Sequence, residues 1–328
     1  MAPTFLTLPP ELREMIYECL FSSITIRHGL GYNKKTSNRT AILRTCRQIQ
    51  DEAQPFLAAN VQVQFRSTEV MLDTLMNLGS TIISKLRHIH VKAFPFPLYA
   101  SGTIRYYTTY HFSNALALLP GLKLDRLVVE DCFHDSGAND GWGDIGTYYD
   151  IESLLESDGW KELHYVSPTT EFMTSSMDHQ RLRVAQPAGW NELLQKRDGE
   201  YSGARVTMHL AKEAERTGMT EDIEQCTPWS AIPGHELKEA ARIISEKQVN
   251  REVRIVARRG RKAPYAQDGS KIDQCIENVF KTNSWEEVKQ KGLYIPDWLP
   301  YYYDSVDRAG WIYGGWSRRF QLALAAMQ

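Results

Sequence analysis

The chain has 328 residues, of which 42% are hydrophobic and 24% are charged, and its formal net charge is −2. These values are ordinary for a folded protein and give no general attraction to nucleic acid or to acidic membranes. The five cysteines are scattered, which indicates free thiols in a reducing compartment. Because we find neither a signal peptide nor a membrane-length apolar run, we expect a cytoplasmic or nuclear protein with no membrane partner.

The first predicted element is a short helix that starts at the Pro9-Pro10 pair. Proline is tolerated in the first turn of a helix because the amide there has no partner to lose. An apolar residue then recurs at every fourth position, and these residues are Leu8, Leu12, Ile16 and Leu20. That spacing places them on one stripe of the helix. We therefore expect a helix with a single apolar face.

A second helix is predicted over residues 41–59, after a polar insert at residues 22–40. Five apolar residues share one side of it: Ile42, Leu43, Cys46, Ile49 and Ala53. Pro55 falls near the end of this segment, and we expect it to kink or stop the helix.

These two segments resemble the F-box, the adaptor-binding module of substrate receptors in SCF ubiquitin ligases. Residues 8–17 read LPPELREMIY, and residues 43–57 read LRTCRQIQDEAQPFL. Both are similar to motifs of a large fungal group of F-box-like proteins, LPPELRxxIY and LLRTCRQIYxEAxPxLY. The resemblance is confined to residues 1–65. The chain departs from the usual F-box in its long insert at residues 22–40, and in Ile49, where a tryptophan is typical.

The resemblance implies a non-catalytic substrate receptor that links a target protein to a Skp-type adaptor and a cullin ubiquitin ligase. The residues that would form or support the adaptor-binding face are Leu8, Pro9, Leu12, Ile16, Leu20, Leu43 and Cys46. Two alternatives remain open. In a self-contained scaffold the helices would serve only as a cap, with Leu12 and Ile16 buried inside the molecule. The third reading is an unrecognised enzyme.

Beyond residue 60 the sequence alternates between strand-like and helix-like segments. A strand is predicted at residues 61–65 and a helix at 68–78. The pattern LxxLxL, with aromatic variants, then occurs at residues 86–91, 124–129 and 160–165, each time after a helix-like segment. A helix and a strand at a fixed period predict an irregular leucine-rich-repeat-like α/β solenoid.

The rest of the chain adds less regular elements. We predict a short helix that ends near Gly199, strands at residues 206–210 and 253–257, and an amphipathic helix at 235–249. The two strands would add units to the solenoid if they join its sheet. The domain division that we expect is an F-box-like segment at 1–60, an irregular α/β repeat region at 61–291 and an aromatic-rich C-terminal cap at 292–328.

The repeats also predict a partner-binding surface, because the residues between the repeated apolar positions point out of the opposite face of the sheet. These residues include His88, His90, Arg126, Glu130, Glu162 and His164. From the aromatic C-terminal segment we add Trp298, Trp311 and Trp316, since tryptophan is enriched at binding hot spots. The alternative interpretations are an ordinary solvated sheet face and a purely structural cap.

The remaining motifs do not predict a metal site, a nucleic-acid-binding site or an active site. His88, His90 and His164 are potential metal ligands, but nothing in the sequence shows that they converge, so we expect no metal and no cofactor. The basic stretch at residues 251–262 is in part a strand, and we do not expect nucleic acid as a partner. We find no G-x-S-x-G, glycine-rich phosphate loop or H-E-x-x-H motif, and we therefore expect no catalytic activity.

Overall fold

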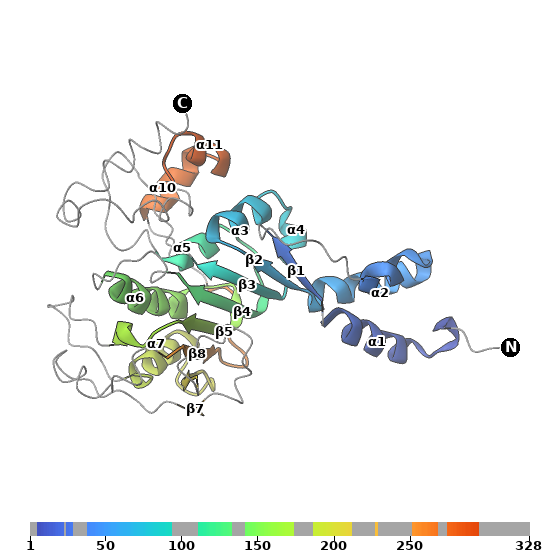
Figure 1. Ribbon diagram of the computed structural model, residues 1–328, viewed down its shortest axis with the longest axis horizontal. Coiled ribbons are helices and arrows are strands. Elements are labelled where there is room, and N and C mark those ends of the chain that lie inside the picture. The colour runs from blue at the N-terminus through green and yellow to red at the C-terminus, as the bar shows by residue number, and fades with distance from the viewer. Residues whose placement is uncertain are drawn as a thin grey trace.

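The computed structural model describes residues 5–22, 24–28, 38–93, 111–132, 142–173, 186–211, 227–228, 251–267 and 274–294. It is an α/β protein in which helices pack along one face of a sheet (Figure 1). The described strands are β1 (Thr25–His28), β2 (Gln62–Phe65), β3 (His88–Ala93), β4 (Leu124–Asp131), β5 (Trp160–Ser167), β6 (Arg205–Leu210), β7 (Thr227–Pro228) and β8 (Val253–Arg258). The strands that we predicted at 61–65, 206–210 and 253–257 are confirmed, as are those of the three repeats.

The helices fall into three groups along the chain. The first is α1 (Pro10–Ser22) and α2 (Arg47–Asn60), with the short 3-10 helices η1 (Phe5–Thr7) and η2 (Asn38–Arg44). The second is α3 (Thr68–Leu75), α4 (Ser80–Ile83), α5 (Phe112–Ala117), α6 (Trp142–Glu156) and α7 (Ala188–Asp198), with η3 (Glu171–Met173) between the last two. The third is α10 (Gln274–Thr282) and α11 (Trp285–Gln290). Gly199 ends α7, as predicted, with a φ of 101° that favours glycine.

The sheet has the strand order β1-β2-β3-β4-β5-β8-β6-β7. Neighbours from β1 to β5 are parallel, and the described helices α2 to α6 lie in the connections between them. The predicted strands at 206–210 and 253–257 join this sheet, but they do not extend the parallel series. Strand β8 runs antiparallel to both β5 and β6. The sheet is therefore mixed, with a parallel part that ends at β5.

The three LxxLxL segments lie side by side in the register that their pattern predicts. Ile89 is opposite Leu127, which is opposite Leu163, and all three are fully buried. Helices α3, α5, α6 and α7 cover this apolar face (Figure 1), and Met71 and Leu72 of α3 belong to the same core. Successive strand residues alternate between the two faces of a sheet, so the opposite face carries the polar residues of the repeats.

The structure differs from the sequence-based expectations at three places near the N-terminus. Residues 41–59 do not form one helix, because Cys46 adopts an extended conformation (φ −159°, ψ 164°) between η2 and α2. Pro55 lies inside α2 and does not stop it. Packing of Ile49 and Ala53 in the core outweighs the hydrogen bond that a proline removes. Strand β1 occupies part of the segment that we expected to be a polar insert.

The last described segment folds back onto α3, more than 200 residues earlier in the chain. The Trp285 Nε1 atom donates a hydrogen bond to Asp73 Oδ1 at 2.6 Å, and Lys289 Nζ donates to the same oxygen at 2.7 Å. The ring of Trp285 lies 4.9 Å from that of the buried Tyr294. The predicted aromatic cap at 292–328 falls mostly outside the described residues, as do its Trp298, Trp311 and Trp316 and the helix predicted at 235–249.

Candidate functional site

Helices α1 and α2, with η1 and η2, form an arm that projects from the β1 end of the sheet (Figure 1). We call residues 5–22 and 38–60 the arm. The face of α1 that packs inward carries Arg13, Tyr17 and Phe21, each four residues after the previous one. Tyr17 and Phe21 are fully buried and share the core with Ile49 and Ala53 of α2. The inward face is therefore not the predicted stripe of Leu8, Leu12, Ile16 and Leu20.

A buried arginine locks the two helices of the arm together. The guanidinium of Arg13 donates to both carboxylate oxygens of Glu52 on α2, with Nε–Oε2 and Nη2–Oε1 distances of 2.8 Å. Arg13 Nη1 also donates to the backbone oxygen of Leu8 at 2.6 Å. The hydroxyl of Tyr17 and the amide of Gln48 donate to the same carboxylate at 3.2 and 3.0 Å. Bidentate arginine–carboxylate pairs fix orientation as well as distance.

These bonds also set the charge state of the pair. Hydrogen bonds from Arg13, and then from Gln48, lower the pKa of Glu52 to about 2. The carboxylate is therefore ionised at neutral pH, where it keeps its bonds to Arg13 and Tyr17. Arg13 and Glu52 were not among the residues that the sequence predicted to be functional. The only feature of the sequence that could have indicated the buried position of Arg13 is its four-residue spacing from Tyr17, which Phe21 continues.

The opposite side of α1 is apolar and exposed. The exposed fractions are 46% for Leu12, 64% for Met15 and 40% for Ile16, and Cys19 is exposed as well. Positions separated by three and four residues are neighbours on a helix, so these side chains make one continuous surface. We call Leu12, Met15, Ile16 and Cys19 the outer face of α1. Met15 and Cys19 were missed by the sequence prediction, although both lie at helical spacing from Leu12 and Ile16.

The structure divides the other predicted adaptor-binding residues. Leu8, Leu20 and Leu43 are half-buried, and both Leu20 and Leu43 pack against the core. Pro9 and Cys46 are exposed. Of the seven exposed large hydrophobic side chains in the described ranges, four lie in α1 or just before it: Leu6, Leu12, Met15 and Ile16. Clustering of this kind marks interaction sites, whereas single exposed apolar residues need no explanation.

The polar face of the sheet is a second candidate surface, and the register brings its predicted residues together in rows. We call His88, Arg126, Glu162, Arg258 and Arg205 the first row, because each lies opposite the next across β3, β4, β5, β8 and β6. His90 and His164 belong to a second row, on either side of Val128. Both histidines were predicted to contact a partner, but each is only 7% exposed.

Glu162 is the electrostatic centre of the first row. Its Oε1 atom lies 2.5 Å from His164 Nε2 and 3.9 Å from Arg126 Nη2, and its Oε2 atom lies 3.5 Å from Arg258 Nε. The hydrogen bond with His164, followed by the neighbouring charges, lowers the pKa of Glu162 to about 2. Glu130, in a further row, lies 3.6 Å from His90 and 3.4 Å from Lys92. Burial opposes ionisation of Glu130, but His90 and Lys92 outweigh it and lower the pKa.

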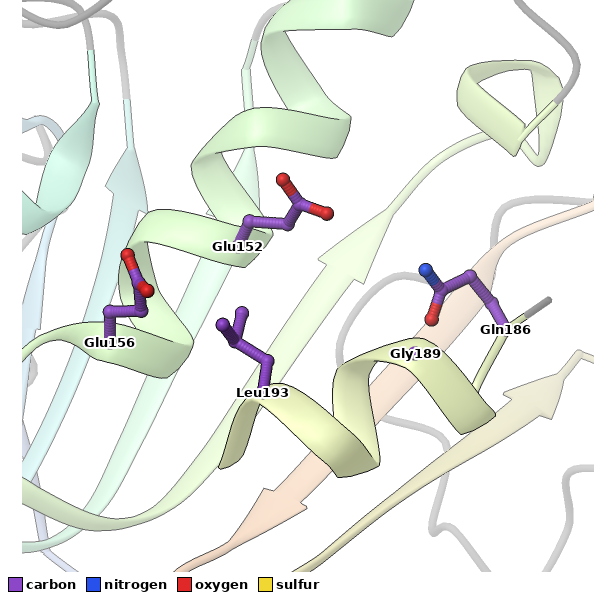
Figure 2. A pocket seen from close by; sticks show the side chains of 5 residues that line it. All are labelled: Glu152, Glu156, Gln186, Gly189 and Leu193. Atoms are coloured by element: carbon purple, nitrogen blue, oxygen red, sulfur yellow. The ribbon is translucent and has the colours of Figure 1, made fainter. Parts of the chain in front are cut away.

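The described residues include no group of three or more histidine, cysteine, aspartate or glutamate side chains placed to hold a metal ion. A small cavity of about 160 Å³ lies between α6 and α7 (Figure 2). Its lining residues are Glu152, Glu156, Gln186, Gly189 and Leu193. The amide of Gln186 donates to the Tyr148 hydroxyl and accepts from the Trp190 backbone N–H, so it serves to join the two helices.

No helix in the part of the chain that the structure describes is long and apolar enough to cross a membrane. Comparison with protein-family models, with curated proteins and with solved structures finds no match for this chain. The arm and the polar sheet face are therefore the two features from which we infer a function.

Proposed function

We propose that this protein is an F-box-like substrate receptor, which couples a target protein to a Skp-type adaptor and a cullin ubiquitin ligase and is not itself catalytic. The observation that carries this proposal is the outer face of α1. This helix buries Tyr17 and Phe21 on one side and leaves Leu12 and Ile16 exposed on the other. The resemblance of residues 8–17 and 43–57 to the F-box motifs points to the same helix as the adaptor-binding element.

Burial of a few side chains on the outer face of α1 is enough for useful affinity toward an adaptor. Complete burial of a leucine, isoleucine or methionine side chain contributes roughly 1.5–3 kcal/mol. Association also loses translational and side-chain entropy, and this loss cancels part of the gain. Because the Arg13–Glu52 pair already orders the arm, little further entropy is lost in presenting Leu12, Met15 and Ile16.

The target would be held by the repeat region. Strands β2 to β5 and their helices supply parallel, sequentially ordered units, as a leucine-rich-repeat-like solenoid does. The polar face of these strands is the surface that we assign to the target. The main alternative is a scaffold that uses the arm as a cap. It requires Leu12 and Ile16 to be covered by the chain, and their exposed fractions of 46% and 40% favour the receptor instead.

The test is co-purification with a fungal Skp-type adaptor. We expect the wild-type chain to bind, and Leu12→Asp and Ile16→Asp each to weaken binding by about 30-fold or more, the factor that a loss of about 2 kcal/mol gives. Both side chains are exposed, so the variants should keep the wild-type circular dichroism spectrum and melting temperature.

Ile82→Asp is the matched control, because Ile82 is 51% exposed and lies on α4, outside the arm. It should bind the adaptor as the wild type does. If the wild-type chain does not bind, or if all three variants bind equally well, the receptor proposal is wrong.

A further inference from the structure

The first row of the polar sheet face has an unbalanced charge. It carries three arginines, Arg126, Arg205 and Arg258, and one carboxylate, Glu162. Arg126 and Arg258 lie on either side of Glu162, at 3.9 and 3.5 Å, so a single carboxylate serves two guanidinium groups. Both arginines are accessible, with 54% and 47% of their side chains exposed, and Arg205 is exposed too.

The register adds a like-charged contact to this row. Arg205 on β6 lies directly opposite Arg258 on β8. Like charges directly opposite each other across two strands are destabilising. Within the described ranges Arg205 forms no ion pair, and Glu162 lies on the far side of Arg258. The sheet therefore holds Arg205 beside another cation, with its guanidinium available to an anion from outside.

Two histidines in or beside the first row have lowered pKa values, and burial is the main cause of both. Burial lowers the pKa of His209, and the charges of Arg254, His164 and Arg258 lower it further. Burial likewise lowers the pKa of His88, and Arg126 and Arg87 add to this against the attraction of Asp125. The positive character of the first row follows from its three arginines and one glutamate, in a chain whose formal net charge is −2.

We propose that Arg126, Arg205 and Arg258 bind a carboxylate-rich segment of a partner protein, by adding to the row the anions that it lacks. Glu162 already shows the contact, since one carboxylate occupies the space between two of these arginines. This inference rests on the proposed function only in identifying the acidic segment as part of the target.

A nucleic acid fits this surface less well. A phosphate backbone follows a continuous positive groove, and proteins that bind single strands add aromatic side chains on which the bases stack. Here Glu162 and Glu130 interrupt the positive charge, and His90 and His164 of the next row are buried. The accessible cations form a short patch, which is suited to a few carboxylates.

The experiment measures fluorescence anisotropy of a labelled poly-glutamate peptide with the full chain, in the absence of any adaptor. We expect saturable binding that weakens as salt is raised, because exposed charge pairs are screened. The variant Arg126→Gln/Arg205→Gln, which leaves Arg258 beside Glu162, should raise the dissociation constant by about tenfold, the factor that about 1.4 kcal/mol gives.

The control variant is Arg261→Gln/Lys262→Gln, which removes the same charge from two exposed residues in the turn after β8. It should bind the peptide as the wild type does, and so should Leu12→Asp. Absence of binding by the wild type, equal weakening in the two double variants, or tighter binding of a length-matched oligonucleotide would each overturn the proposal. Because no adaptor is present, none of these outcomes bears on the outer face of α1.

Discussion

Replacing Asp198 by alanine should destabilise the protein by about 3–5 kcal/mol, the range for breaking a buried ion pair by removing one partner. The Asp198 carboxylate is inaccessible to solvent at the end of α7. Its Oδ1 atom accepts a hydrogen bond from Arg197 Nη1 at 2.7 Å and lies 3.4 Å from Arg259 Nη1. Its Oδ2 atom accepts from the Gly260 backbone N–H at 2.9 Å.

The cost is high because both arginines stay buried when the carboxylate is removed. Arg259 stacks on Trp160, with its guanidinium carbon 4.0 Å from the ring centre, and burial, followed by repulsion from Arg197, lowers the pKa of Arg259 to about 9. It therefore remains charged at neutral pH. Arg197 keeps a partner in Asp158, but Arg259 loses its carboxylate.

Denaturant unfolding at neutral pH measures this prediction. The control is Asp51→Ala, because Asp51 is exposed on α2, and surface substitutions of this kind usually change stability by less than about 0.5 kcal/mol. A loss below about 1 kcal/mol for Asp198→Ala would show that water can reach Arg197 and Arg259 and take the place of the carboxylate.

The second large effect concerns Asp150 on α6, which is completely buried. Its Oδ1 atom accepts a hydrogen bond from the Phe112 backbone N–H at 2.6 Å, at the start of α5. Burial, reinforced by the nearby Asp131 and opposed by the Phe112 bond, raises the pKa of Asp150 to about 8. The folded protein therefore holds this carboxyl group in its protonated form at neutral pH.

Since the folded-state pKa lies above the unfolded value of about 3.9, the unfolded chain ionises first as the pH rises. The free energy of unfolding should then fall by about 1.4 kcal/mol per pH unit between the two pKa values. Asp150→Asn removes this dependence, and its amide oxygen can still accept from Phe112. Between pH 5 and pH 7.5, the free energy of unfolding of the variant should therefore rise by about 3 kcal/mol relative to that of the wild type.

Urea titrations of both proteins across this pH range give the comparison. Asp51→Asn, an exposed site on α2, should leave the wild-type pH dependence unchanged. Parallel curves for the wild type and Asp150→Asn would mean that Asp150 ionises in the folded state as it does in the unfolded chain. Burial would then not raise the pKa of Asp150, and the prediction would be wrong.

The sequence predicted most of the apolar face of the sheet, because alternation along a strand directly encodes which residues share a face. Ile89, Leu127 and Leu163 could be placed in one row from the LxxLxL pattern alone. The same alternation occurs in parallel and antiparallel strands, so the reversed direction of β8 could not be read from it. Alternation also shows on which face a residue lies but not what covers it, and hence the buried His90 and His164 were unexpected.

The arm was predicted in part. The pattern located α1 and its exposed residues Leu12 and Ile16, but it assigned Leu8 and Leu20 to the same surface. The inward face was missed because Arg13 looks like a solvent-facing residue. Its burial depends on Glu52, which lies 39 residues away in the sequence and meets it only in the folded chain. A local periodicity cannot reveal a pair of this kind.

In the proposed receptor, the outer face of α1 becomes buried against a Skp-type adaptor. Cys19 provides a direct probe, because it is exposed on that face. We would measure its alkylation rate by peptide mass spectrometry, with and without adaptor, in the wild type and in Leu12→Asp. We expect adaptor to slow alkylation of Cys19 in the wild type and to leave it unchanged in Leu12→Asp. An unchanged rate in the wild type at saturating adaptor would show that the outer face of α1 does not bind the adaptor.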